Sequence, residues 1–155
     1  MRKVLAFIVA ALVLSFSGCS SKSAEAADTT LSAPAEKEVS TYLLGAYVDV
    51  KTAEAKLKEA GFEVVTAYEV DKKGLYTSIV FTNGALKAAA NKPGRGYAAV
   101  LRLLVNGEKQ EISITNPIYY GKAFLQDEFD YQAALAIEKS LRSVFGELKG
   151  SDDKW

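Results

Sequence analysis

The stretch that most constrains the fold of this sequence runs from Tyr97 to Pro117, where two alternating apolar segments flank Asn106-Gly107. An Asn-Gly pair in this setting is typical of a two-residue type I′ turn, because both central residues of that turn need a positive φ. Such a turn fixes the register of the hairpin. The predicted pairs are Val105 with Glu108, Leu103 with Gln110, Leu101 with Ile112, Ala99 with Ile114, and Arg102 with Glu111. We expect the apolar side chains of these pairs to face the core.

Hydrophobic periodicity and capping residues predict the other elements. The predicted strands cover 42–50, 62–70 and 76–82. The predicted helices cover 50–60, capped by Asp49 and ended by Gly61, and 84–90, after Asn83, and a loop follows over 91–96. A short helix runs from Asn116-Pro117 to Phe124, and a last helix is capped by Asp130 and has an apolar stripe up to Gly150. In strand 62–70, one face should carry Phe62, Val64, Thr66, Tyr68 and Val70. The order predicts a single two-layer α+β domain with a curved antiparallel sheet of about five strands and helices packed on it.

The N-terminal sequence predicts the cellular location of the protein. Arg2 and Lys3 precede an apolar run over 4–14 that suits a secretory signal better than a membrane span. Small residues then lead to Cys19, the only cysteine of the 155 residues, which resembles the lipidated cysteine of a bacterial lipoprotein signal. We expect a signal peptide over 1–18, a lipidated Cys19 with a flexible tether over 19–40, the domain over 41–150, and a frayed tail over 151–155. A plain signal peptide with a chance cysteine is the alternative.

The charge balance argues against nucleic acid as a partner. Removal of residues 1–18 leaves 17 basic and 19 acidic side chains, a formal net charge of −2, whereas nucleic-acid binding needs a strongly basic face. The chain has no histidine, which removes the commonest general base and metal ligand. We therefore expect no metal and no cofactor.

Several segments together resemble a known family. They are the helix exit Gly61-Phe62, the strand end over 79–83, the hairpin over 99–105 with its Asn-Gly turn, and Ile114-Thr115-Asn116-Pro117. They resemble the bacterial domain of unknown function 302 over about residues 41–148, although Gly84 stands where that family has proline and the loop over 91–96 differs in composition. The resemblance implies a small α+β domain with a curved antiparallel sheet, and no established chemistry.

Candidate site residues are few. Tyr119 and Tyr120 follow Asn116-Pro117, and adjacent helical residues point about 100° apart, so only one of the two tyrosines can serve the core. We predict a binding surface made by Tyr119, Tyr120, Asn116, Arg95 and Arg102, with no catalytic residue assigned. Asp127, Glu128 and Asp130 form an acidic cluster that predicts a solvated helix-capping turn more readily than a cation site.

The expected function is a lipid-anchored extracytoplasmic binding or interaction module, located at the bacterial outer membrane and facing the periplasm. Its partners would be the membrane, through the lipid, and an envelope protein or a small molecule. An enzyme of unrecognised type that uses carboxylate, tyrosine and arginine groups, or a structural lipoprotein of the envelope, are the alternatives. The sequence does not predict the ligand or the oligomeric state.

Overall fold

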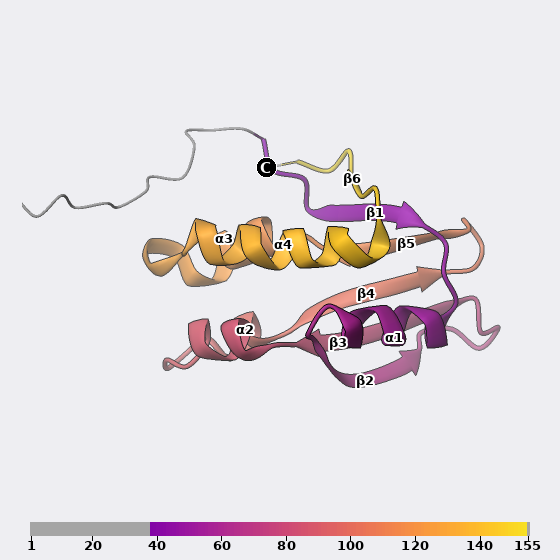
Figure 1. Cartoon of the computed structure of the whole chain (residues 1–155), viewed down its shortest axis with the longest axis horizontal. Helices are drawn as coiled ribbons and strands as arrows, with labels where there is room; N and C mark the ends of the chain where they lie inside the picture. The colour runs from indigo at the N-terminus through magenta and orange to yellow at the C-terminus, as the bar shows by residue number, and fades with distance from the viewer. Residues whose placement is uncertain (1–37, 155) are drawn as a thin grey trace, which may run out of the picture. The chain divides into compact units, whose positions relative to one another are not determined.

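One antiparallel sheet organises the described part of the chain. The computed structural model describes residues 38–154, so the predictions for the signal segment, Cys19 and the tether up to residue 37 lie outside it. The strands are β1 (Tyr42–Ala46), β2 (Glu63–Glu69), β3 (Tyr76–Thr82), β4 (Leu101–Asn106), β5 (Glu111–Thr115) and β6 (Lys149–Gly150) (Figure 1). Their order in the sheet is β2-β3-β4-β5-β1-β6. The predicted α+β class is confirmed, with a sixth strand of only two residues.

Four α-helices accompany the sheet within residues 38–154: α1 (Val50–Glu59), α2 (Gly84–Ala89), α3 (Pro117–Leu125) and α4 (Tyr131–Phe145). All four begin at the predicted caps, because the side chain of the preceding Asp or Asn accepts a hydrogen bond from a backbone N–H of the first turn. β1 ends at Ala46 rather than at the predicted Val50, since Val50 already belongs to the helix that Asp49 caps.

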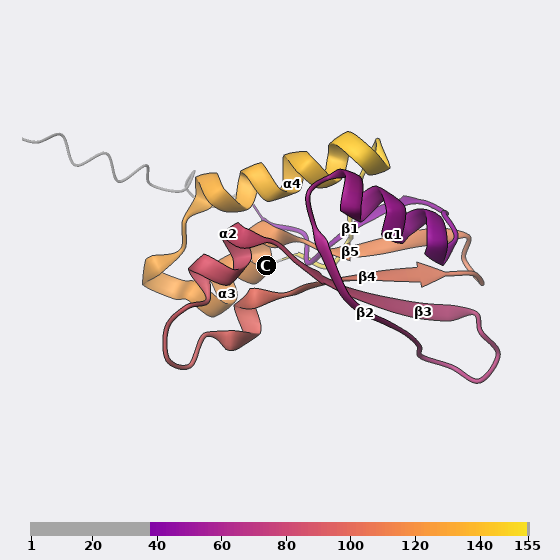
Figure 2. The same ribbon diagram turned by 60° about the horizontal axis from the view of Figure 1, so that its bottom comes forward.

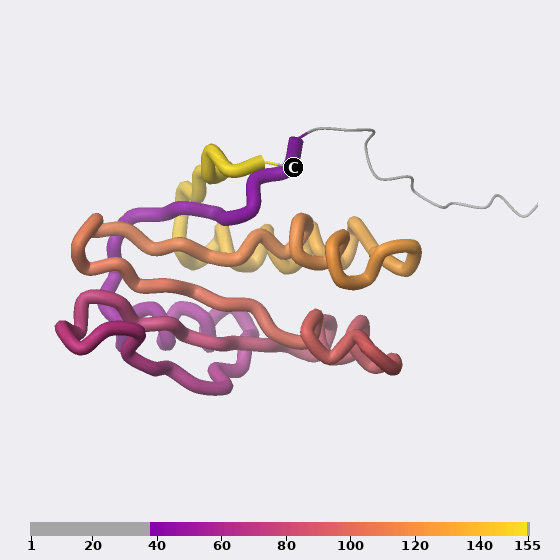
Figure 3. Tube along the Cα trace, turned by 180° about the vertical axis from the view of Figure 1, so that it is seen from behind, coloured from indigo at the N-terminus to yellow at the C-terminus, as the bar shows by residue number. Residues whose placement is uncertain are grey.

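Helices α1 and α4 cover one face of the sheet (Figure 2), and the hydrophobic core lies between these helices and the sheet. Leu57 of α1 and Leu141 of α4 are fully buried against sheet residues such as Ile79, Leu103 and Ile114. Seen from behind, the strands lie in front of α1 and α4, while α2 and α3 gather at one end of the sheet (Figure 3). Among residues 38–154, no helix therefore covers the strands on the second face of the sheet.

The β4–β5 hairpin has a different turn from the predicted one. The loop has four residues, over 107–110, and Asn106 is the last residue of β4, where it pairs with Glu111. The side chain of Asn106 closes this loop, since its Oδ1 accepts a hydrogen bond from the Lys109 N–H at 2.9 Å. The left-handed residue is Gln110 with a φ of 53°, and Gly107 has no positive φ. The type I′ prediction, and the register drawn from it, are wrong.

The register error is an even number of residues, so the core face was nevertheless predicted correctly. The observed pairs are Leu103 with Ile114, Leu104 with Ser113, and Val105 with Ile112, a shift of four residues from the prediction. Because side chains alternate with a period of two, such a shift leaves every side chain on the same face. The expected pair of Arg102 with Glu111 is lost, and Arg102 lies beside Val80 of β3 instead.

A bulge changes the faces of β2. The register between β2 and β3 shifts between Val64 and Thr66, so Val64 pairs with Phe81 on the core face, whereas Thr66 pairs with Val80 on the open face. The prediction that alternate residues from Phe62 to Val70 all share one face is therefore wrong, because Val65 is an extra residue in the strand. Tyr68, which pairs with Ser78, is placed on the open face by this bulge.

The C-terminal segment is not frayed. Helix α4 ends at Phe145, and Gly146 turns the chain with a φ of 77°, so Leu148 enters the core beyond the helix rather than as part of its stripe. β6 then pairs with β1, and the Ser151 N–H donates to the Tyr42 carbonyl oxygen at 2.9 Å. Lys154 forms an isolated bridge with Ser40. For residues 151–154 the expectation of fraying is wrong, because their backbone groups have partners in β1 and in the two residues that precede it.

Candidate functional site

The open face of the sheet carries a groove of about 680 Å³, within the range of ordinary ligand sites. Its floor consists of side chains that point away from α1 and α4. Cross-strand pairing aligns Ser78 of β3 with Leu104 of β4, and Leu104 with Ser113 of β5. Helix α3 closes one end with Tyr119, Tyr120, Ala123 and Phe124. The floor therefore alternates hydroxyl and apolar groups, and the wall at the end is aromatic.

Among the described residues that line this groove, Arg102 is the one with a charged side chain. It is exposed, and it belongs to none of the six ion pairs found within residues 38–154. Its cross-strand neighbour Val80 is apolar. The guanidinium group presents a fork of donors that matches a carboxylate or a phosphate, so the groove has a free anion-binding group.

Aromatic side chains line the same groove as this cation. Tyr42, Tyr68 and Phe124 are 42%, 49% and 41% exposed, which is high for large side chains that line a concave surface. The Phe124 ring lies 4.5 Å from that of Tyr120 and 6.1 Å from that of Tyr97, measured between centroids. This row of aromatic side chains offers apolar surface to a ligand without any rearrangement of the core.

Three of the five predicted site residues come together in this groove: Arg102, Tyr119 and Tyr120. Both tyrosines are half-buried and line the groove, but they differ in their packing. Tyr120 packs against the main hydrophobic core, whereas Tyr119 is half-buried at the groove and also borders a shallow depression with Val39, Lys122 and Ala123. The structure thus assigns the packing role to Tyr120.

Asn116 is a structural residue rather than a part of the binding surface. It is 5% exposed, its Oδ1 accepts from the Ile118 N–H at 3.0 Å, and its Nδ2 donates to the Ser40 carbonyl oxygen at 2.8 Å. Both ends of the amide are occupied by backbone groups. Asn116 therefore joins the start of α3 to the segment that precedes β1.

Arg95 also lies outside the groove. Its guanidinium group donates to Glu128 at 2.8 Å, and Lys92 binds the same carboxylate, so these side chains tie the loop after α2 to the short 3₁₀ turn over 126–128. The hydrogen bond from Lys92 and the charge of Arg95 hold the pKa of Glu128 below its ordinary value. Asp130 caps α4. The acidic cluster thus acts as the predicted capping turn.

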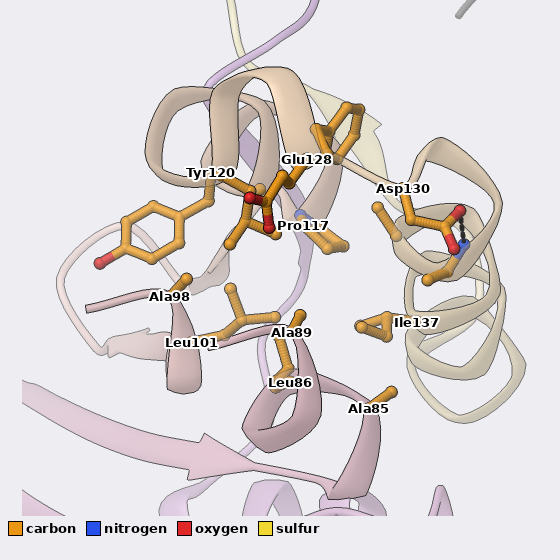
Figure 4. A pocket seen from close by; sticks show the side chains of 15 residues that line it. Ala85, Leu86, Ala89, Ala98, Leu101, Pro117, Tyr120, Glu128, Asp130 and Ile137 are labelled. Atoms are coloured by element: carbon orange, nitrogen blue, oxygen red, sulfur yellow. Dashed lines mark hydrogen bonds between the residues drawn. The ribbon is translucent and has the colours of Figure 1, made fainter. Parts of the chain in front are cut away.

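A second pocket lies beside this ion-pair cluster, between α2, α3 and α4. Figure 4 shows Leu86, Leu101 and Ile137 converging on it from α2, β4 and α4. Its volume is about 60 Å³, enough for only a few water-sized groups. We regard it as a packing gap between helices, and the open-face groove as the candidate site.

Neither a metal centre nor a membrane span is found in the described residues. Within 38–154, no group of three or more Asp, Glu, His or Cys side chains is arranged to hold a metal ion. In the same part of the chain, no helix combines the length and the apolar character that are needed to cross a bilayer. Comparison of the whole chain with protein-family models and with curated proteins finds no match. The resemblance to the domain of unknown function 302 therefore stays a prediction.

The predicted binding surface left out three residues that line the groove: Tyr42, Tyr68 and Phe124. Strand alternation could have found Tyr42, since it lies on the face of β1 opposite to the buried Leu43. Predicting Tyr68 as a groove residue requires the position of the bulge, and predicting Phe124 requires the position of α3 relative to the sheet. Neither the bulge nor the position of α3 is indicated by a local sequence pattern.

Proposed function

We propose that this protein is a binding module that takes up a small ligand with one negative charge and an apolar body, at the groove on the open face of its sheet. The observation that carries this proposal is Arg102, an exposed cation without an acidic partner in the described residues, in a groove that aromatic and aliphatic side chains also line. A surface arginine of this kind is usually paired or surrounded by water. Here the groove supplies what an amphipathic anion needs.

The expected energetics favour such a ligand. A carboxylate that receives two hydrogen bonds from a guanidinium forms a charge-assisted pair, about twice as strong as a neutral hydrogen bond. The apolar body would cover Leu104 and Phe124, and each buried methylene contributes about 0.8 kcal/mol. The hydroxyl groups of Ser78 and Ser113 lie on the same face and are available to the second oxygen. Together these terms are compatible with micromolar binding.

The test is a thermal-shift screen of small anions with apolar bodies against the full-length protein in nanodiscs. A ligand present at 100 times its dissociation constant stabilises the folded state by about 2.7 kcal/mol, which raises the melting temperature by roughly 10 °C for a domain of this size. Arg102→Gln should abolish this shift. Lys109→Gln, which removes one positive charge from the exposed hairpin loop, is the matched control and should preserve it. The proposal fails if no compound gives a shift that depends on Arg102.

The location is a part of the same proposal. The charged start, the apolar run and Cys19 support export and lipidation, which would anchor the domain at the outer membrane with its binding face in the periplasm. Ser20 follows the cysteine, and it is not the aspartate that retains enterobacterial lipoproteins at the inner membrane. The membrane is then the first partner of the chain, through the lipid.

A further inference from the structure

The polypeptide joins the domain at the rim of the groove. Thr41 and Tyr42, the last residue before β1 and the first residue of it, both line the groove. Val39, two residues before Thr41, lies in the depression that Tyr119 and Ala123 border from α3. Everything that precedes residue 38 therefore departs from the domain beside the aromatic end of the groove.

This junction is held from two sides. From α3, Asn116 donates its side-chain N–H to the Ser40 carbonyl oxygen at 2.8 Å and its backbone N–H to that of Thr41 at 3.0 Å. From the C-terminal segment, the Asp153 carbonyl oxygen accepts from the Thr41 N–H at 2.9 Å. The Ser151 hydroxyl also accepts from the Tyr42 N–H at 3.2 Å. The departure point is thus fixed relative to the groove.

The predicted anchor is close to this point along the chain. Glu38 lies nineteen positions after Cys19, and the fully extended chain between them is at most about 65 Å long. A flexible chain of this length, which the composition predicts, spans about 25 Å on average. A lipid on Cys19 would therefore keep the rim of the groove close to the bilayer surface.

The charge of the groove selects among the molecules that a bilayer contains. Arg102 supplies one positive charge, and none of the groove-lining residues within 38–154 is acidic. A zwitterionic headgroup would bring a cation that finds no carboxylate there, whereas a single carboxylate needs only the guanidinium. An aliphatic chain would then lie along Leu104, Ala123 and Phe124.

We propose that the groove takes a single-chain lipid carboxylate, a fatty acid, from the bilayer to which the protein is anchored. This inference rests on the proposed function and adds the class and the source of the ligand. The fixed junction brings the groove to the membrane, and the guanidinium group of Arg102 pairs with the single carboxylate.

The experiment uses the full-length protein in vesicles of phosphatidylethanolamine and phosphatidylglycerol, with a photoreactive palmitate analogue as the probe. After irradiation, peptide mass spectrometry locates the label. We expect labelling within the α3 segment over 119–124 and around Tyr42, reduced about tenfold in Arg102→Gln and unchanged in Lys109→Gln. Palmitate should compete with the probe, and methyl palmitate should not. Because both variants share the same bilayer, partition of the probe into lipid cancels in the comparison.

Different results separate this inference from the function on which it rests. Labelling that is confined to residues 1–37, or that does not depend on Arg102, overturns the fatty-acid proposal. If an aromatic acid such as naphthoate gives an Arg102-dependent thermal shift while palmitate neither shifts nor competes, the binding function stands and the lipid class is wrong. If neither acid depends on Arg102, both proposals fall.

Discussion

The junction between the tether segment and α3 gives the sharpest test of the structure, through Asn116→Ala. The Asn116 side chain makes two buried hydrogen bonds that serve different purposes. Its oxygen caps α3 through the Ile118 N–H, and its nitrogen holds the Ser40 carbonyl oxygen in place. Alanine removes both hydrogen bonds and leaves the Ser40 carbonyl without its side-chain donor.

The expected cost is the sum of two effects. Loss of an N-cap acceptor costs about 1 kcal/mol. Loss of a buried hydrogen bond that leaves its partner without a donor costs about 1–2 kcal/mol more. We therefore expect Asn116→Ala to lower the free energy of unfolding by about 2–3 kcal/mol, which corresponds to roughly 10 °C in melting temperature.

Urea denaturation followed by circular dichroism measures this loss, with two comparison variants. Asp130→Ala removes only a cap, the one at the start of α4, and should cost about 1 kcal/mol. Asn116→Ser keeps a capping oxygen but lacks the amide donor, so it should cost about 1–2 kcal/mol. Equal m-values among the variants are needed for this comparison.

The reasoning is refuted if Asn116→Ala is no more destabilising than Asp130→Ala. The bond to Ser40 would then contribute nothing, and the departure point of the chain at the groove rim would not be fixed by it. Equal losses in Asn116→Ala and Asn116→Ser would instead show that the capping bond is the dispensable one of the two.

Three further predictions follow from the site and its surroundings. Tyr120→Ala should cost about 2 kcal/mol, because Tyr120 packs against the core, whereas Tyr119→Ala should cost less than about 1 kcal/mol and weaken ligand-dependent thermal shifts; equal destabilisation would contradict this division. The pKa of Glu128 is lowered in the folded state, so the ionised carboxylate stabilises the fold at pH values above the pKa of Glu128 in the unfolded chain, and this stabilisation is lost as the pH falls. The difference in free energy of unfolding between wild type and Glu128→Gln, measured by urea denaturation, should therefore shrink from pH 6 to pH 3. A constant difference would count against the ion pairs. Mass spectrometry of the purified protein should find acyl chains at Cys19 that are lost in Cys19→Ser, and an unmodified wild-type mass would exclude the lipid anchor.

Local chemistry in the sequence determined the helices and the buried face of the hairpin. Asp49, Asn83, Asn116 and Asp130 each cap a helix at the predicted position, because a capping bond joins residues only two or three apart. The core face of β4 was also predictable, since alternation depends on the strand alone.

Tertiary contacts decided the hairpin register, the course of the C-terminus and most of the site. Asn106 pairs with Tyr76 of β3 as well as with Glu111, so it belongs to strand β4 rather than to the turn. A local Asn-Gly pattern contains no information about pairing with β3. The same register pairs Glu111 with Asn106, four positions along β4 from Arg102, so the expected pair of Arg102 with Glu111 does not form. Residues 149–154 remain ordered because β1 offers them hydrogen-bond partners more than 100 positions away.

The groove itself combines both sources. Tyr119 and Arg102 could be chosen from the sequence, because their neighbours along the chain explain neither of them as core. Their meeting with Tyr68 depends on one extra residue in β2 and on the position of α3 at the end of the sheet. The proximity of these three side chains depends on the packing of elements far apart in sequence, which no local sequence pattern encodes.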